Sequence, residues 1–111
     1  HFTNVVFNLM DNAVKYRRKD SALELKVTTW NEPKRMCISI QDNGIGIKKD
    51  DLKKIFEKFY RVPTGNRHDV KGFGLGLAYV DKIIKDHKGS IHAESEVGIG
   101  TRFVIKLPSL A

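Results

Sequence analysis

The first sixteen positions carry apolar residues at three- and four-residue steps, which is the spacing of one face of an α-helix. The apolar positions are Phe2, Val5, Val6, Leu9, Met10, Ala13 and Val14. This pattern predicts an amphipathic helix over residues 2–16.

After this helix the apolar period changes to two, which is typical of a β-strand with one buried face. Apolar and polar residues alternate in two runs, first through Leu23, Leu25 and Val27 and then through Met36, Ile38 and Ile40. Residues 31–34, Asn-Glu-Pro-Lys, stand between the runs and have the composition of a turn. The sequence therefore predicts an antiparallel hairpin over residues 23–41.

The second half of the chain returns twice to helical spacing and then to alternation. One helix is predicted over about residues 50–60, and another runs from about Leu75 to His87 before the stop signal Gly89. Two strands follow, at 90–95 and 101–107, with a turn between them.

These elements predict an α+β fold: a two-layer sandwich in which about three helices pack on a mixed, mostly antiparallel sheet. The composition agrees, because 111 residues with 41% hydrophobic and 30% charged side chains suffice for one core but not for two. We therefore expect a single domain over residues 1–111.

The charge balance is basic, with 20 Lys and Arg against 13 Asp and Glu and a formal net charge of +7. Such a surplus attracts polyanions, including nucleic acid, anionic membrane and nucleotide phosphates. The basic residues are scattered over predicted helix faces rather than gathered with exposed aromatic residues. A nucleic-acid partner is not expected, and a steep salt-dependent DNA shift would be needed to support one.

Cysteine and histidine usage excludes several kinds of site. Cys37, the one cysteine, rules out an intramolecular disulfide framework and a Cys-rich zinc site, and it is most simply a packed thiol. The four histidines share no spacing typical of a metal site. No apolar run of about 18 residues and no export signal is visible.

The polar side of the first helix carries an unusual row of side chains. At 100° per residue, Asn8, Asn12 and Lys15 fall within about 60° of one another, opposite the apolar stripe. An Asn oxygen is a hard ligand for Mg²⁺, and Lys supplies a point charge for phosphate oxygens. The row suits a phosphate with its metal ion, although an ordinary solvated face has the same composition.

Residues 42–47, Asp-Asn-Gly-Ile-Gly-Ile, follow the end of a predicted strand. Asp42 offers a carboxylate acceptor, and Gly44 and Gly46 let the backbone approach a flat ligand closely. An adenine amino group needs such an acceptor. A common strand-ending turn remains the alternative.

A second glycine-rich segment, residues 72–77, opens the last predicted helix. Free N–H groups and the positive end of a helix dipole favour an anion at this position. Its spacing is neither the dinucleotide fingerprint nor a Walker A loop. The polar segment 61–74 before it is a long loop, and loops of this length are commonly functional or disordered. The glycines suit phosphate binding, a hinge for this loop, or both.

In combination these segments resemble the boxes of sensor histidine kinases. Residues 8–16 resemble the N box, 42–47 the first glycine box, 56–61 the F box, 72–77 the second glycine box and 98–101 the last one. The match spans about residues 4 to 107 in the order and spacing of that family. The chain resembles the catalytic, ATP-binding domain of a two-component histidine kinase, in the superfamily that includes Hsp90, MutL and gyrase ATPases.

The resemblance implies ATP and Mg²⁺ as cofactors. At the adenine end, Asp42 would accept from the amino group, Tyr16 would lie against the ring, and Thr101 would complete the polar corner. At the phosphate end, Asn12 would hold Mg²⁺, Asn8 would support the phosphates and Lys15 would meet their oxygens. The remaining implied nucleotide-binding positions are Gly44, Gly46, Ile47, Tyr60, Arg61, Lys71, Gly72, Gly74, Leu75, Gly76 and Leu77. Asn8, Asn12, Lys15 and Arg61 are the residues expected to act in catalysis.

One residue helps to choose among the activities of this superfamily. Its ATP hydrolases typically place a Glu four positions before the magnesium Asn, as the general base for water. Here that position is Asn8, whose amide cannot take a proton at neutral pH. Transfer of the γ-phosphoryl group to a protein histidine is therefore expected, with slow intrinsic ATP hydrolysis.

The resemblance also implies partners outside this chain. A phosphoacceptor histidine on a dimerising helical hairpin would receive the phosphoryl group, and an Asp of a response regulator would receive it next. None of the four histidines here has that setting, so we expect this chain to be a fragment of a larger, homodimeric protein. The family's N-terminal edge strand is expected to be missing from the fragment. The domain is expected to be cytoplasmic and its parent anchored in the plasma membrane.

Overall fold

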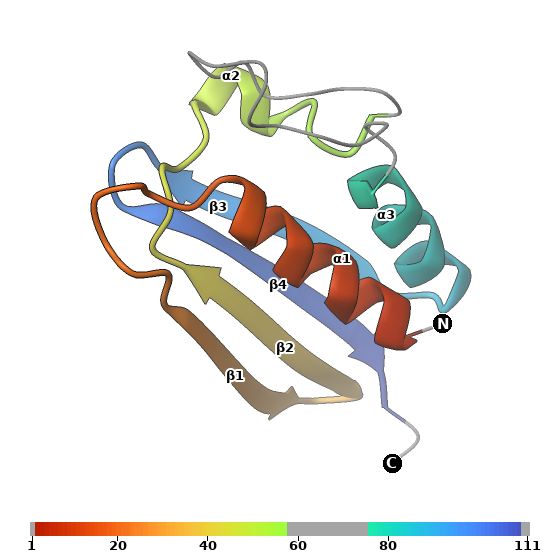
Figure 1. Ribbon diagram of the computed structural model, residues 1–111. Coiled ribbons are helices and arrows are strands. Elements are labelled where there is room, and N and C mark those ends of the chain that lie inside the picture. Colours follow the sequence, from red (N-terminus) through yellow and green to blue (C-terminus); the bar gives the residue numbers. More distant parts are fainter. Residues whose placement is uncertain (1, 58–75, 110–111) are drawn as a thin grey trace.

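The computed structural model describes residues 2–57 and 76–109. The elements in chain order are α1 (Phe2–Lys15), β1 (Leu25–Glu32), β2 (Arg35–Asp42), α2 (Lys49–Leu52), α3 (Gly76–Asp86), β3 (Ser90–Glu96) and β4 (Gly100–Pro108). Figure 1 shows α1 and α3 side by side over one face of a single sheet. The predicted two-layer α+β fold with three helices is confirmed.

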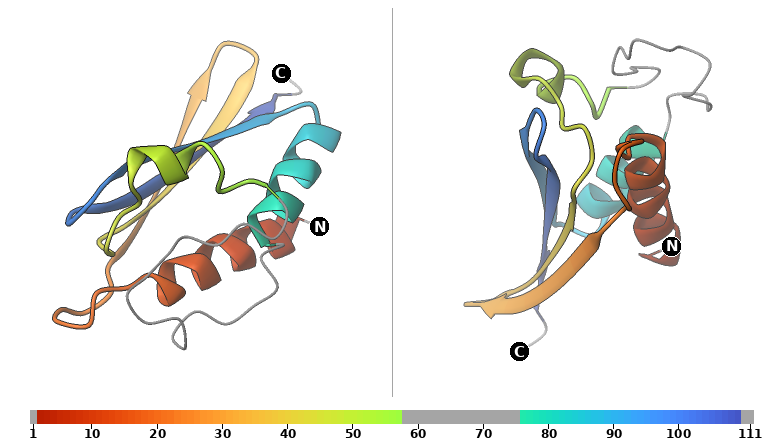
Figure 2. Two further views of the ribbon diagram at one scale, coloured as in Figure 1. Left: turned by 90° about the horizontal axis from the view of Figure 1, so that it is seen from above. Right: turned by 60° about the vertical axis from the view of Figure 1, so that its left-hand side comes forward.

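The four strands lie in the order β1-β2-β4-β3, and each neighbouring pair is antiparallel. The predicted hairpin is the β1–β2 pair, and the two predicted C-terminal strands are the β3–β4 pair. Because β4 lies between β2 and β3 and is antiparallel to both, the ends of β2 and β3 and the beginning of β4 lie together at one edge of the sheet. That edge carries Asp42 and Thr101, and Figure 2 shows it from two further sides.

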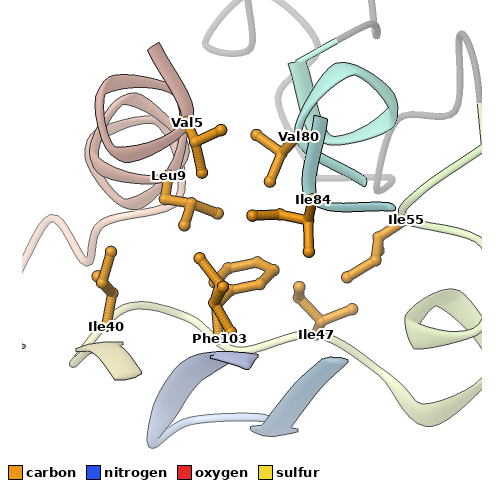
Figure 3. Packing of buried hydrophobic residues seen from close by; sticks show 9 residues of the cluster. Val5, Leu9, Ile40, Ile47, Ile55, Val80, Ile84 and Phe103 are labelled. Atoms are coloured by element: carbon orange, nitrogen blue, oxygen red, sulfur yellow. The ribbon is translucent and has the colours of Figure 1, made fainter. Parts of the chain in front are cut away.

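A single apolar core lies between the helices and the sheet. Val5 and Leu9 of α1 and Val80 and Ile84 of α3 point toward Phe103 of β4, as Figure 3 shows. All five side chains are almost wholly buried. The apolar residues that recur at helical spacing in α1 and α3 therefore pack in one cluster with those that alternate in β4, as the sequence predicts.

Burial differs from the sequence pattern at the margin of this core. Met10 and Val14 of α1 are 44% and 43% exposed, and Val27 of β1 is 62% exposed. The stripe that faces the sheet is narrower, because only Val5, Leu9 and Ala13 follow one line down the helix. The helical layer also leaves the outer strand β1 uncovered (Figure 1).

Cys37 is a buried free thiol, in agreement with the prediction of a packed side chain. It lies on the sheet face that points away from the helices, where Trp30 is its partner in register. Arg102 stacks over the Trp30 ring at 5.7 Å.

The predicted helix over residues 50–60 is wrong in its extent. α2 ends at Leu52, and the chain continues in turns with the bonds Lys54 N–H to Asp51 C=O and Glu57 N–H to Lys54 C=O. These three-residue steps bring Ile55 into the core and Phe56 edge-to-face against Phe103, with ring centres 6.3 Å apart. Tertiary packing thus outweighs helix propensity here. Residues 58–60 lie outside the described residues.

Candidate nucleotide-binding site

The last residue of β2, Asp42, is the centre of the candidate site. Its Oδ1 atom accepts hydrogen bonds from the backbone N–H of Gly44 at 2.8 Å and of Thr101 at 3.2 Å. Its Oδ2 atom accepts none from the described residues. The side chain is half-buried, so one carboxylate oxygen is fixed by the backbone and the other remains an acceptor for a ligand.

Burial raises the pKa of Asp42 above the ordinary 3.8, and the hydrogen bonds from Gly44 and Thr101 oppose the rise without cancelling it. Because the pKa is raised in the folded state, the carboxyl group contributes most to stability when it is protonated. That contribution is lost as the pH rises through the folded-state pKa.

We expect NMR titration of the Asp42 carboxyl carbon to give a pKa above 3.8 in the free domain. Added Mg·ADP is expected to lower this pKa, because an adenine amino group that donates to the carboxylate favours its charged form. The reference is Glu32 on the other sheet face, whose pKa is lowered by hydrogen bonds from Trp30 and Lys106. An Asp42 pKa that nucleotide leaves unchanged contradicts the proposed contact.

Ser95 of β3 supports the Asp42 site through Thr101, and this residue was not predicted from the sequence. Its hydroxyl accepts the Ile47 N–H at 2.7 Å, donates to the Gly100 carbonyl at 2.9 Å and lies 2.8 Å from the Thr101 hydroxyl. Ser95 and Thr101 are directly opposed in the β3–β4 register, so only the strand pairing reveals their contact. Ser95 positions the strand that supplies the Thr101 N–H to Asp42.

Replacing Ser95 by alanine is expected to destabilise the domain by about 1–3 kcal/mol, because the Ile47 N–H and the Gly100 carbonyl each lose their partner. Urea unfolding of Ser95→Ala measures this loss. The matched control is Ser90→Ala, at an exposed position of the same strand, with an expected change within about 0.5 kcal/mol. Equal effects at the two positions contradict the role assigned to Ser95.

Three glycines of the site are required by contacts within the protein. A Cβ atom on Gly44 would lie 2.5 Å from the Tyr16 carbonyl oxygen, and one on Gly46 would lie 2.3 Å from the Glu96 carbonyl oxygen. At Gly100 the same atom would lie 2.0 Å from the Asp42 carbonyl oxygen. For Gly44 and Gly46, whose predicted role is to let the backbone approach a ligand, the structure adds contacts within the protein that a side chain would prevent. The three glycines let three backbone segments close around Asp42, before any ligand is considered.

The loop that follows α1 is tied to the first glycine-rich segment. The Asn43 side chain donates to the Ala22 carbonyl at 3.0 Å and accepts the Glu24 N–H at 2.8 Å. The Ile45 N–H donates to the Tyr16 carbonyl at 3.0 Å, and Arg18 donates to the Gly98 carbonyl. Asn43 and Arg18 were not predicted as site residues, because their partners are distant in sequence. These bonds place Tyr16 beside the glycine-rich segment.

The predicted polar row of Asn8, Asn12 and Lys15 lies on α1, and its three side chains differ in the partners they bind. Asn8 donates from Nδ2 to the Asn4 carbonyl at 2.8 Å, and Lys15 forms an ion pair with Asp11 at 3.0 Å. The Asn12 side chain makes no hydrogen bond with the described residues. As far as the described residues show, the Asn12 amide oxygen is available to a ligand, whereas Lys15 would have to turn from Asp11 to meet a phosphate.

These residues fit a magnesium ion that arrives with a nucleotide. Mg²⁺ keeps several waters and binds through few protein oxygens together with substrate phosphates. The Asn12 amide oxygen matches that demand. The described residues contain no cluster of three His, Cys, Asp or Glu side chains that would hold a metal without a nucleotide.

The remaining predicted residues divide into two groups. Gly76 begins α3, Leu77 packs against the core, and the Ile47 side chain is buried within it. The predictions at Tyr60, Arg61, Lys71, Gly72, Gly74 and Leu75 lie outside the described residues. The structure joins Asp42, Gly44 and Thr101 by direct hydrogen bonds, while Asn8, Asn12 and Lys15 lie together on α1.

Comparison with known families decides the identity of this arrangement. The pattern described as "Histidine kinase-, DNA gyrase B-, and HSP90-like ATPase" matches residues 1–111. The chain belongs to this family.

Within the described residues, no helix is both long enough and apolar enough to cross a membrane.

The family domain is similar to sensor kinases of known sequence. It is 71% identical over 110 residues to the sensor protein RprX of Bacteroides fragilis, covering 99% of this chain and 21% of that protein. It is 43% identical over 106 residues to the sensor protein kinase WalK of Staphylococcus aureus, covering 96% of this chain and 26% of that protein. The chain thus spans about a fifth to a quarter of these relatives.

Solved structures of sensor kinases share the fold of this family domain. The mycobacterial sensor histidine kinase MprB superposes with a TM-score of 0.81 at 27% identity, over 95% of this chain and 70% of that one. Full-length ShkA, solved in complex with AMPPNP, superposes with a TM-score of 0.78 at 29% identity, over 95% of this chain and 20% of that one. The likeness to histidine kinases expected from the sequence motifs is confirmed.

Proposed function

We propose that this domain binds Mg·ATP and donates the γ-phosphoryl group to a histidine on a separate dimerisation and phosphoacceptor domain. The phosphoryl group then passes to an Asp of a response regulator. The observation that carries the proposal is Asp42, with one oxygen held by two backbone amides and the other left for a ligand at a glycine-bounded edge of the sheet.

At the adenine end, Asp42 Oδ2 accepts from the exocyclic amino group and Thr101 completes the polar corner. The geometry supports this because the Gly44 and Thr101 amides fix the carboxylate before the ligand arrives, so little ordering remains to be done on binding. Tyr16 lies against the ring, because the bond from Ile45 to its carbonyl places it beside the glycine-rich segment.

At the phosphate end, Asn12 holds Mg²⁺, Asn8 supports the phosphates and Lys15 exchanges its Asp11 partner for a phosphate oxygen. Further contacts are proposed from Tyr60, Arg61 and Lys71, and from the backbone of Gly72, Gly74, Leu75, Gly76 and Leu77. Bound Mg²⁺ supplies charge neutralisation on the phosphate oxygens.

The transfer step is an in-line displacement. A neutral imidazole nitrogen of the acceptor histidine forms a bond to the γ-phosphorus while the bond to the β-phosphate oxygen breaks and ADP leaves. Asn8 stands one helical turn before Asn12 and cannot remove a proton from water at neutral pH. The chain's own residues therefore position and neutralise charge, which favours transfer to a protein over hydrolysis.

The test is phosphorylation of a phosphoacceptor domain taken from a related sensor histidine kinase. Labelled γ-phosphate from ATP is expected to appear on its histidine only when Mg²⁺ and this domain are both present. ATP binding without transfer would support a nucleotide-binding module used for regulation instead. Fast Mg²⁺-dependent ATP hydrolysis by the domain alone contradicts the role given to Asn8.

The parent protein is proposed to be a homodimeric sensor anchored in the plasma membrane, with this domain in the cytoplasm. The support is its similarity to sensor proteins of which it covers only a part. A response regulator receiver domain is then the second protein partner.

A further inference from the structure

A polar cavity lies at the end of the sheet opposite to Asp42. It has a volume of about 250 Å³ and is formed where the β1–β2 turn, the α3–β3 turn and the end of β4 meet. Arg35 and Asp42 are the two ends of β2, so the length of this strand separates the cavity from the candidate nucleotide site. Nothing in the proposed kinase reaction uses it.

Four cationic side chains line this cavity: Lys34, Arg35, Lys88 and Lys106. Lys106 pairs with Glu32 at 3.3 Å. Among the described residues, no acid lies within 4.0 Å of the charged groups of the other three. The Arg35 charge still interacts with the Glu32 carboxylate, so Lys34 and Lys88 are the two cations of the cavity that have no acidic partner within the described part of the chain. The four cationic residues come from three separate segments.

Two of these lysines occupy an uncommon backbone conformation. Lys34 has φ of 63° and Lys88 has φ of 62°, and no other described residue except glycine has a positive φ. Both positions lie in tight turns where glycine is favoured, because a Cβ atom is poorly accommodated at positive φ. Residues held in this region cluster at ligand-binding sites. Lysine at both positions gives the cavity two positive charges, at the cost of backbone strain that glycine would not have.

We propose that this cavity binds a phosphate group, carried either by a free phosphate compound or by a lipid headgroup. A phosphate is a compact anion with several oxygens and close to two negative charges, which the Arg35 fork and the two lysine ammonium groups can share. The exposed Ser90 hydroxyl at the cavity edge adds a hydrogen-bond donor.

Trp30 provides an optical reporter for this site. Its indole N–H donates to Glu32 Oε2 at 3.2 Å, while Lys106 donates to Glu32 Oε1 at 3.3 Å. A phosphate that draws Lys106 toward the cavity weakens its bond to Glu32 and changes the environment of the indole. The chain has a single tryptophan, so a change in indole fluorescence arises at Trp30, which contacts both Glu32 and Arg102.

The experiment titrates the 111-residue chain with pyrophosphate and, separately, with vesicles of phosphatidylcholine containing phosphatidic acid. Calorimetry and sedimentation give the affinities, and Trp30 fluorescence shows whether the surroundings of the indole change on binding. Saturable pyrophosphate binding with a fluorescence change identifies a free phosphate compound as the source. Vesicle binding without pyrophosphate binding identifies the lipid headgroup. Binding of neither probe overturns the proposal.

The decisive variant combines Lys34→Gly and Lys88→Gly. Because glycine is the favoured residue at both φ values, this variant is expected to melt at the same or a higher temperature while its affinity for the bound probe falls at least tenfold. The matched control combines Lys53→Gln and Lys54→Gln, two exposed positions just after α2, with the same loss of charge and unchanged affinity.

Two outcomes of the variant experiment overturn the proposal. Unchanged affinity of the double glycine variant places the anion elsewhere, including on the α1 face, which this variant leaves intact. An equal loss in the Lys53 and Lys54 control shows a general charge effect. If the glycine variant melts at a lower temperature, Lys34→Gln alone repeats the test without altering the backbone.

Discussion

The Asp42→Asn variant is expected to lose adenine-nucleotide binding while it keeps the fold. An Asn Oδ1 atom can still accept from the Gly44 and Thr101 amides, and these two donors fix the orientation of the new side chain. Its NH₂ group then takes the place of Oδ2, so a donor faces the adenine amino group. The mismatch is expected to weaken binding by about 10- to 100-fold, from a cost of about 1–3 kcal/mol.

A thermal melt with Mg·ADP measures this effect. ADP at about 100 times its dissociation constant is expected to stabilise the natural domain by about 2.7 kcal/mol. If affinity falls 100-fold, the same concentration stabilises Asp42→Asn by only about 0.4 kcal/mol. The control is Asp50→Asn, an exposed carboxylate of α2 that loses the same charge and is expected to keep the full ligand shift.

Mg·GDP makes the Asp42 experiment specific for the adenine contact. Guanine presents a carbonyl oxygen where adenine presents its amino group, so the Asn donor suits it better than the natural carboxylate does. Asp42→Asn is expected to lose the ADP shift and to keep or gain a GDP shift. An ADP shift equal to that of the natural domain contradicts the position proposed for adenine.

Regular periodicity made most of the fold predictable. Val5 and Leu9 recur at helical spacing, and Phe103 and Ile105 alternate in β4, so the elements and the buried face follow from local pattern. The exposure of Val27 does not follow from that pattern, because it depends on how far the helical layer extends over β1. The early end of α2 likewise depends on where Phe56 must lie to meet Phe103.

The candidate site was predictable where its chemistry is carried by one segment. Asp42 was predicted because the carboxylate and the spaced glycines after it lie in one segment, residues 42–47, which resembles the first glycine box of histidine kinases. Ser95 was missed because its three partners come from the loop after β2 and from β4, and a lone serine in a strand gives no local signal. The close approach of Gly46 to the Glu96 carbonyl is invisible to sequence analysis for the same reason.

The second large effect is expected at Asn12, where alanine should reduce phosphoryl transfer by about 100-fold or more at saturating ATP. The reason is the loss of the amide oxygen that is proposed to hold Mg²⁺ against the phosphates, where charge neutralisation supplies much of the catalysis. Alanine favours a helix more than asparagine does, so α1 and the fold are expected to remain intact.

The measurement is transfer to the phosphoacceptor domain, combined with ADP binding in the presence and absence of Mg²⁺. Asn12→Ala is expected to bind ADP equally with and without the ion, because the Asp42 contact does not involve the metal. Asn31→Ala, at an exposed position of β1, serves as the control and should retain both transfer and the Mg²⁺ dependence. If Asn12→Ala keeps the Mg²⁺ dependence of ADP binding, other residues hold the ion and the proposed role of Asn12 is wrong. If it loses that dependence but transfers at the natural rate, the ion is held at Asn12 without contributing to the rate-limiting step.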